Sequence, residues 1–155
     1  MRELIQQAMK DAMKSGAKRR LSTLRLVTAA IKDRDIAARV DDKGHATGRD
    51  RVDDTEILAL LQKMIKQRRE SAEIYRQGGR EELAEQENQE IAIIEEFLPK
   101  QMSEDETRAA CKEAVGTLAA TGLKDMGRVM ASLKEKFTGR MDFGKASGMI
   151  KEMLK

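Results

Sequence analysis

Apolar side chains recur along most of this chain at intervals of three and four residues, the spacing that gathers them on one face of an α-helix. In the first two thirds of the chain the pattern predicts four helices, at residues 2–15, 18–39, 54–77 and 80–97. Glycine follows the first and third of these runs, and glycine just past a periodic run commonly ends a helix. The pattern therefore predicts an all-α fold.

The connection between residues 54–77 and 80–97 consists of Gly78 and Gly79. So short a link leaves the second helix little alternative to running back antiparallel beside the first. We therefore predict a long antiparallel hairpin. Its facing apolar positions are Ile57, Leu61, Met64, Ile65, Ala72 and Tyr75 on one helix and Leu83, Ile91, Ile94 and Leu98 on the other.

Pro99, the only proline, predicts a domain boundary, because proline cannot continue a helix and pushes the preceding residue out of helical geometry. We expect an N-terminal helical domain at residues 1–99 and a C-terminal three-helix bundle at residues 100–155. Ser103 and Glu106 have capping-box spacing at the start of the bundle. Its helices should span about 104–121, 125–137 and 144–155.

Residues 41–53, DDKGHATGRDRVD, contain two glycines, mixed charge and no apolar periodicity. Such a stretch is typical of a surface connection, and we predict a mobile loop. The only histidine, His45, lies in it. The next helix should begin with Asp53 or Asp54 as its N-cap and Glu56 in its first turn.

The composition supports helices and bounds the location of the protein. Of 155 residues, 37% are charged and only 3% aromatic, and the common residue types favour helices. No apolar run reaches the ~18 residues of a membrane span, and the first 30 residues lack the apolar core of a signal peptide. The single cysteine, Cys111, excludes an internal disulfide and a cysteine-cluster metal site. We therefore expect a cytoplasmic protein.

The net charge of +3 hides an asymmetry along the chain. Residues 1–40 hold ten Lys or Arg against four Asp or Glu, whereas residues 78–98 hold one arginine against seven glutamates. A polyanion would meet a dipole and not a uniform cation.

Basic residues recur every seven positions on the second predicted helix. Seven residues make almost two full turns, so such a row stays on one side of the helix over about 31 Å. The row could follow a phosphate backbone, or it could pair with the acidic fourth helix and lay its stems along the apolar border. Both interpretations stay open for its members, Lys18, Arg25, Lys32 and Arg39.

Three charged residues fall inside the apolar faces of the predicted hairpin. Counted from Gly78 and Gly79, Arg68 lies about ten residues back, and Glu87 and Glu90 lie about nine and eleven forward. At 100° per residue they should face one another. We predict a partly buried charge cluster that fixes the hairpin register, with a functional carboxylate as the alternative.

The residue inventory provides no catalytic site. A nucleophile needs a positioned base, and His45 lies in a loop, while Cys111 is in register with Val115 and Leu118 and should be buried. One histidine and one cysteine cannot make a metal site, and we expect neither metal nor cofactor.

Residues 139–146, GRMDFGKA, resemble a nucleotide-binding P-loop only superficially. Ala146 stands where that motif has a magnesium-binding Ser or Thr, and a helix and not a strand precedes it. We therefore do not expect ATP binding. Arg140, Lys145 and the amides at the following helix start could still hold one phosphate of a larger ligand.

Three longer runs carry a family resemblance: KRRLSTLRLVTAAIKDRDI at 18–36, LLQKMIKQRRESAEIYRQGGREELAEQENQEIAIIEEFLPKQ at 60–101 and MGRVMASLKEKFTGRMDFGKAS at 126–147. Together they resemble the GatB/YqeY-like domain family over nearly the whole chain. In that family the domain stands alone or extends the B subunit of the aspartyl/glutamyl-tRNA amidotransferase, in which the part similar to residues 100–155 contacts tRNA.

The resemblance implies a non-catalytic tRNA-binding accessory module. The family label, carbon-nitrogen ligase activity with glutamine as amido-N-donor, should apply only to the larger assembly. Met141 and Phe143 make one turn more apolar than the usual family form, and we expect both to pack on the core. The implied RNA-binding residues are Lys134, Lys136, Gly139, Arg140 and Lys145 in the C-terminal domain and Lys18, Arg19, Arg25 and Lys32 in the N-terminal domain.

Few aromatic residues are present to stack on unpaired bases, so a bound nucleic acid should be a folded RNA or a duplex read by shape and phosphates. Among folded RNAs the resemblance implies tRNA. We expect no DNA and no membrane partner, and an aminoacyl-tRNA enzyme is a further candidate. The alternative function is a protein-interaction adaptor that docks a partner without RNA.

Overall fold

The structure, a computed structural model that describes residues 1–155, is all-helical, which confirms the predicted fold class. Its only β-type pairing is an isolated bridge between Val40 and Ala46. The chain divides into two compact units, Met1–Leu98 and Pro99–Lys155. None of the helices combines the length and apolarity that a bilayer span requires.

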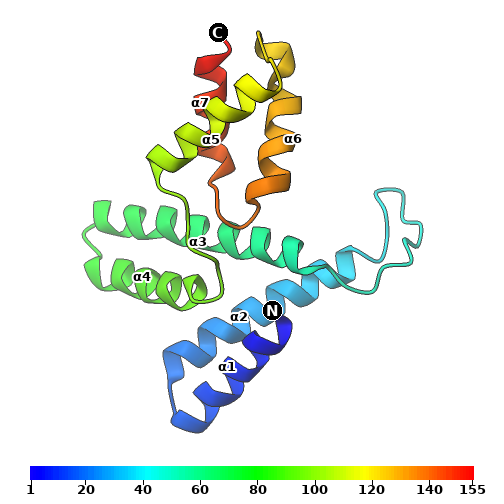
Figure 1. Cartoon of the computed structure of the whole chain (residues 1–155). Helices are drawn as coiled ribbons and strands as arrows, with labels where there is room; N and C mark the ends of the chain where they lie inside the picture. The colour runs from blue at the N-terminus through cyan, green and yellow to red at the C-terminus, as the bar shows by residue number, and fades with distance from the viewer. The chain divides into compact units, whose positions relative to one another are not determined.

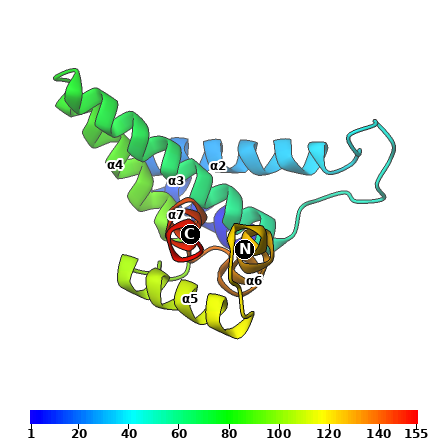
Figure 2. The ribbon, with the colours of Figure 1, turned by 90° about the horizontal axis from the view of Figure 1, so that it is seen from above.

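The first unit contains four helices that form two antiparallel pairs (Figure 1). Helices α1 and α2 pack together, and α3 and α4 pack together more extensively, with α2 also against α4 (Figure 2). The bounds are α1 Arg2–Ser15, α2 Lys18–Ala37, α3 Asp54–Gln77 and α4 Glu81–Glu95.

The core of this unit is centred on α3, whose buried face contains six side chains. Of the predicted apolar positions of α3, all but Tyr75 are buried, and the prediction omitted Leu60. From α2 the buried residues are Thr23, Leu24, Val27 and Ile31, and α4 adds Ala84, Ile91 and Ile94.

Local capping chemistry explains where α3 begins and ends. Asp53 accepts a hydrogen bond from the Glu56 amide at 2.8 Å, and Glu56 returns one to the Asp53 amide, which confirms the predicted N-cap. At the other end Gly79, at φ 73°, turns the chain so that the Arg80 amide donates to the Tyr75 carbonyl. The left-handed conformation suits glycine, and α4 starts directly afterwards.

Helix α2 ends two residues earlier than predicted, at Ala37, so Arg39 lies outside the helix. The segment that follows contains a hydrogen-bonded turn. Asp41 accepts the amides of Lys43 and His45 in a tight turn, and Val52 is buried in the core. The turn at Asp41 forms in place of another turn of α2, because an Asp side chain readily accepts hydrogen bonds from the backbone amides that follow it.

The second unit contains α5 Glu104–Thr117, a 3-10 turn Leu123–Asp125, α6 Met126–Phe137 and α7 Phe143–Met153. Each of its three α-helices packs against the other two. The capping box of Ser103 and Glu106 is present as predicted. Cys111 is fully buried, and burial raises the pKa of its thiol, so it is a core side chain.

Helix α5 ends at Thr117, four residues before the predicted end. The Ala120 amide donates to the Val115 carbonyl and the Ala119 amide to the Gly116 carbonyl, the two bonds of a Schellman motif. This motif places Ala119 at φ 50°, the only non-glycine residue with positive φ. An alanine there stores strain that a glycine would avoid.

We expect Ala119→Gly to raise the free energy of unfolding by about 0.5–1 kcal/mol, because glycine adopts positive φ without a steric penalty. Urea unfolding followed by circular dichroism measures this change. Ala131→Gly, at an exposed position of α6, is the matched control and should lower stability by about 1 kcal/mol. Destabilisation by both substitutions would contradict the strained conformation of Ala119.

Candidate functional site

Exposed basic side chains gather around the connection between α6 and α7. Lys134 and Lys136 lie in the last turn of α6, and Lys145 lies in the first turn of α7. All three are exposed, and none makes an ion pair within the chain. We call these three residues and Arg140 the α6–α7 basic surface. Lys134 and Lys136, two residues apart, extend from different sides of the last turn of α6.

Two of the backbone amides at the start of α7 are already occupied. The Asp142 carboxylate accepts hydrogen bonds from the amides of Gly144 at 3.0 Å and Lys145 at 3.2 Å. A phosphate placed there would have to displace this cap and would meet a fixed negative charge. With Asp142 in this position the two amides are not available to a phosphate, which leaves the side chains of Arg140 and Lys145 from the expected phosphate contact.

Gly139 and Arg140 have structural roles in the turn. Gly139 is buried at φ 86°, and its carbonyl accepts a hydrogen bond from Gln101 Nε2 at 2.6 Å. Arg140 Nε donates to the Lys100 carbonyl at 3.2 Å, which leaves the guanidinium half-exposed. Gly139 thus shapes the surface without being accessible, and Arg140 is oriented by its contact.

The apolar residues of the same turn anchor it to the core. Met141 is fully buried, and Phe143 packs partly buried against the same cluster, as the sequence led us to expect. The Arg140 amide and the Met141 amide both donate to the Phe137 carbonyl. The turn therefore presents its basic side chains from a fixed backbone.

The second predicted basic surface lies on α2. Lys18, Arg25 and Lys32 are exposed and make no ion pair within the chain. Arg19 differs, because its guanidinium lies 3.9 Å from the Glu90 carboxylate of α4. The α2 basic row, by which we mean Lys18, Arg25 and Lys32, is consequently free to meet an anion, whereas Arg19 is partly neutralised.

Arg68 and Glu90 form an ion pair between α3 and α4. Arg68 Nε lies 3.0 Å from Glu90 Oε2, the two side chains are 14% and 18% exposed, and Arg68 also donates to the Met64 carbonyl. With Arg19 at its other oxygen, Glu90 joins three helices. This geometry ties the register of α3 to that of α4.

Glu87 lies one turn before Glu90 and makes no ion pair. Desolvation raises its pKa above the ordinary value, and the nearby Glu90 adds to this effect while Arg68 opposes it. The two glutamates therefore differ in their environment. Glu90 is ion-paired with Arg68, whereas Glu87 lies near Arg68 without forming an ion pair.

A second charged network was not predicted from the sequence. Arg2 forms two hydrogen bonds with Asp35, at 2.6 and 2.9 Å, and also donates to the Val52 carbonyl at 2.9 Å. Asp35 in turn accepts the Val52 amide at 2.9 Å, and these contacts lower the pKa of Asp35, chiefly through Arg2. The network joins α1, the end of α2 and the segment before α3.

The remaining candidates for chemistry are not assembled into a site. His45 Nδ1 lies 3.4 Å from Asp41 Oδ2 on the exposed turn, so it has a nearer partner than the sequence indicated. No three His, Cys, Asp or Glu side chains come together in a way that could hold a metal ion. Cys111, the other candidate for chemistry, is fully buried in the core of the second unit.

These features define an all-helical protein of two units with unpaired cations on each. A family model described as Yqey-like protein matches residues 2–154. The chain therefore belongs to the YqeY-like protein family. It is also similar to an uncharacterized protein of Schizosaccharomyces pombe, with 28% identity over 103 residues, which cover 66% of this chain and 76% of the yeast protein.

The two hairpin glutamates should respond oppositely to neutralisation. Glu90→Gln should lower the free energy of unfolding at pH 7 by about 2–3 kcal/mol, because it leaves Arg68 and Arg19 without their carboxylate in a partly desolvated site. Glu87→Gln should raise it by about 0.5 kcal/mol, because it removes a carboxylate that is costly to ionise.

The effect of Glu87→Gln should also depend on pH in a defined direction. A carboxyl whose folded pKa is raised stabilises the fold below its unfolded pKa of about 4.3, and this contribution is lost as the pH rises through the folded value. The advantage of Gln over Glu should therefore be present at pH 7 and vanish near pH 4. Denaturant titrations at several pH values measure this difference. The same titrations at pH 7 test Glu90→Gln, and unchanged stability of that variant would contradict a stabilising Arg68–Glu90 ion pair.

Proposed function

We propose that this protein is a non-catalytic accessory protein that binds tRNA through the α6–α7 basic surface. The observation that carries the proposal is the set of exposed, unpaired lysines, Lys134, Lys136 and Lys145, on one connection of the C-terminal unit. The resemblance to the GatB/YqeY-like domain family supports it, because the similar tail of the amidotransferase B subunit contacts tRNA. Membership of the YqeY-like family agrees with this resemblance.

The chemistry of this surface favours phosphate contacts over base recognition. Lysine ammonium groups act as point charges that neutralise phosphates without reading sequence. Phe137 and Phe143, the aromatic residues nearest to the surface in sequence, pack partly buried against the core, so they offer little area for stacking on unpaired bases. A folded RNA with closely spaced phosphates suits such a surface better than a single strand.

Because the Asp142 carboxylate occupies two amides of α7, these amides do not contribute to anion binding. An anion is then held by separate lysine side chains, and it must carry several phosphates to contact more than one of them. A free nucleotide could reach only one or two ammonium groups and would gain little. The ligand of this proposal is therefore a polyanion of fixed shape, and tRNA is the member of that class which the family resemblance indicates.

Binding of an unmodified tRNA should weaken steeply with salt, because each neutralised phosphate contributes a slope of about 0.7–0.9 in log K against log salt. The triple variant Lys134→Ala/Lys136→Ala/Lys145→Ala should lower affinity by about tenfold or more and reduce the slope by about 2 to 3. Filter binding or fluorescence anisotropy over a salt series measures both quantities.

Matched control variants distinguish binding at the α6–α7 basic surface from non-specific attraction by any exposed lysine. Lys112→Ala and Lys151→Ala remove exposed lysines of α5 and α7 outside the connection and should change affinity less than twofold or so. If these controls weaken binding as much as the triple variant does, attraction is non-specific and the proposed surface is wrong.

The protein alone should lack the carbon-nitrogen ligase activity of the related assemblies, because no nucleophile and base are positioned together. Incubating the purified chain with misacylated tRNA, ATP and glutamine should yield no amidated aminoacyl-tRNA. The complete amidotransferase serves as the positive control. Robust turnover by this chain would overturn the accessory role and would require a catalytic site.

A further inference from the structure

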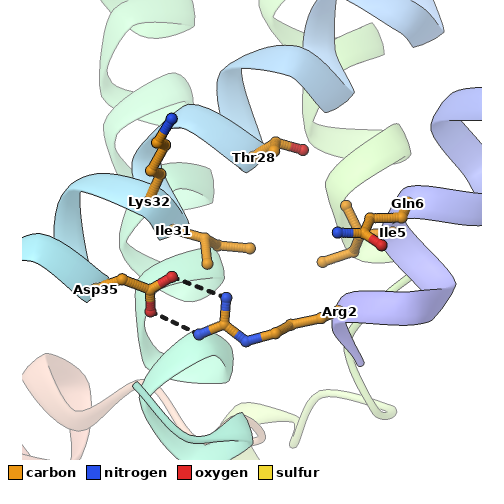
Figure 3. A pocket seen from close by; sticks show the side chains of 7 residues that line it. All are labelled: Arg2, Ile5, Gln6, Thr28, Ile31, Lys32 and Asp35. Atoms are coloured by element: carbon orange, nitrogen blue, oxygen red, sulfur yellow. Dashed lines mark hydrogen bonds and ion pairs between the residues drawn. The ribbon is translucent and has the colours of Figure 1, made fainter. Parts of the chain in front are cut away.

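A hollow of about 180 Å³ lies between α1 and α2 in the N-terminal unit. Figure 3 shows Ile5 of α1 and Ile31 of α2 directed toward each other at its floor, with the Arg2–Asp35 pair closing one end. Both isoleucines are at most 5% exposed, so the floor is a fixed part of the core. A cavity of roughly 150 Å³ accepts a benzene-sized group, so this hollow has room for one apolar side chain.

The rim of the hollow is polar, and its uncompensated charge is positive. Lys32 and Gln6 stand on opposite sides, and neither side chain makes a hydrogen bond or ion pair within the chain (Figure 3). The one carboxylate, Asp35, is held by two hydrogen bonds from Arg2. A ligand would therefore meet an available ammonium group and amide beside an aliphatic floor.

The positive charge continues along α2 away from the hollow. Arg25 and Lys18 follow Lys32 at intervals of seven residues, about 10.5 Å apart along the axis, and stay on the same side of the helix. Met13, seven residues after Gln6, stays on the Gln6 side of α1 and is 56% exposed. The face combines a basic row, the hollow and one exposed apolar side chain.

We propose that this face binds an acidic amphipathic helix of a partner protein, with one leucine-sized side chain in the hollow and carboxylates on Lys32 and Arg25. A partner helix with acidic residues seven apart repeats the axial spacing of these two cations. Its apolar residue would enter the hollow beside Lys32 and fill the space above Ile5 and Ile31. This is the helix-in-groove mode of recognition, with charge setting the orientation.

The positive charge of this face would also suit an RNA ligand, but the aliphatic lining of the hollow favours a protein ligand. A nucleic acid has no flexible aliphatic group to fill a space floored by two isoleucines, and its bases bind by stacking on aromatic side chains, of which the hollow has none. A protein helix can satisfy both the aliphatic floor and the basic rim. The proposal is independent of tRNA binding at the α6–α7 basic surface.

The test uses the full chain, labelled with ¹⁵N and on its isoleucine methyls, and a stapled helical peptide of about 15 residues as the probe. The probe carries a central leucine and glutamates spaced seven apart. We expect saturable shifts at the Ile5 and Ile31 methyls and at the Lys32 amide. Replacing the leucine by alanine, or the glutamates by glutamine, should each weaken binding by about tenfold.

Protein variants with matched controls separate the hollow from general attraction. Gln6→Phe, which places a ring at the hollow, and Lys32→Glu should each weaken the peptide by about tenfold. Gln7→Phe on the outer side of α1 and Lys66→Glu on α3 are exposed controls and should stay within about twofold. Circular dichroism confirms that all four variants remain helical.

Two outcomes would overturn the proposal. One is the absence of shifts at Ile5 and Ile31 when the peptide is in millimolar excess. The other is that a short RNA duplex shifts these residues while the peptide does not, which would assign this face to RNA. Loss of tRNA binding in the α6–α7 triple variant would leave the peptide result unchanged, so the two proposals fail separately.

Discussion

The N-terminal unit depends on ion pairs at its partly buried charged residues, because a charge removed from water is costly unless an opposite charge pairs with it. Arg2 with Asp35 and Arg68 with Glu90 are the two places where its helices bring charged groups into partly buried contacts, and each pair joins separate elements. Apolar packing could tolerate small shifts of α1 on α2 or of α3 on α4, whereas an ion pair cannot lose its partner without a large penalty. The two pairs therefore fix the mutual register that the apolar faces leave less closely defined.

The same rule determines which cations remain for binding. Arg2 and Arg68 are engaged in partly buried pairs with carboxylates of their own unit, and giving up these pairs to an external anion would cost stability. Arg19 is more exposed, and its contact with Glu90 at 3.9 Å is weaker. The cations left free include those of the α2 basic row and of the α6–α7 basic surface. The strong charge asymmetry of the sequence is thus only partly expressed at the surface, since the acidic α4 takes up a share of the positive charge of α2 and α3.

Periodicity and capping chemistry were sufficient to predict the helical class, the starts of α3 and α5 and most of the buried face of α3, because these depend on residues close in sequence. The ends of α2 at Ala37 and of α5 at Thr117 were not predicted. At both places a hydrogen-bonded turn and one more helical turn differ little in free energy, so the sequence pattern does not decide between them. The Arg2–Asp35–Val52 network could not be predicted, since its members lie up to 50 residues apart and nothing local distinguishes Arg2 from other arginines. Asp142 before a periodic run was a readable N-cap signal that would have identified the occupied amides.

Asp142 also decides what the start of α7 can offer to an anion. Its carboxylate accepts the amides of Gly144 and Lys145, two donors that are close in sequence to the Arg140 and Lys145 side chains. With glycine at this position both amides would be free to donate, and the negative charge beside them would be gone. One carboxylate thus separates a capped helix start from one that can hold a single phosphate.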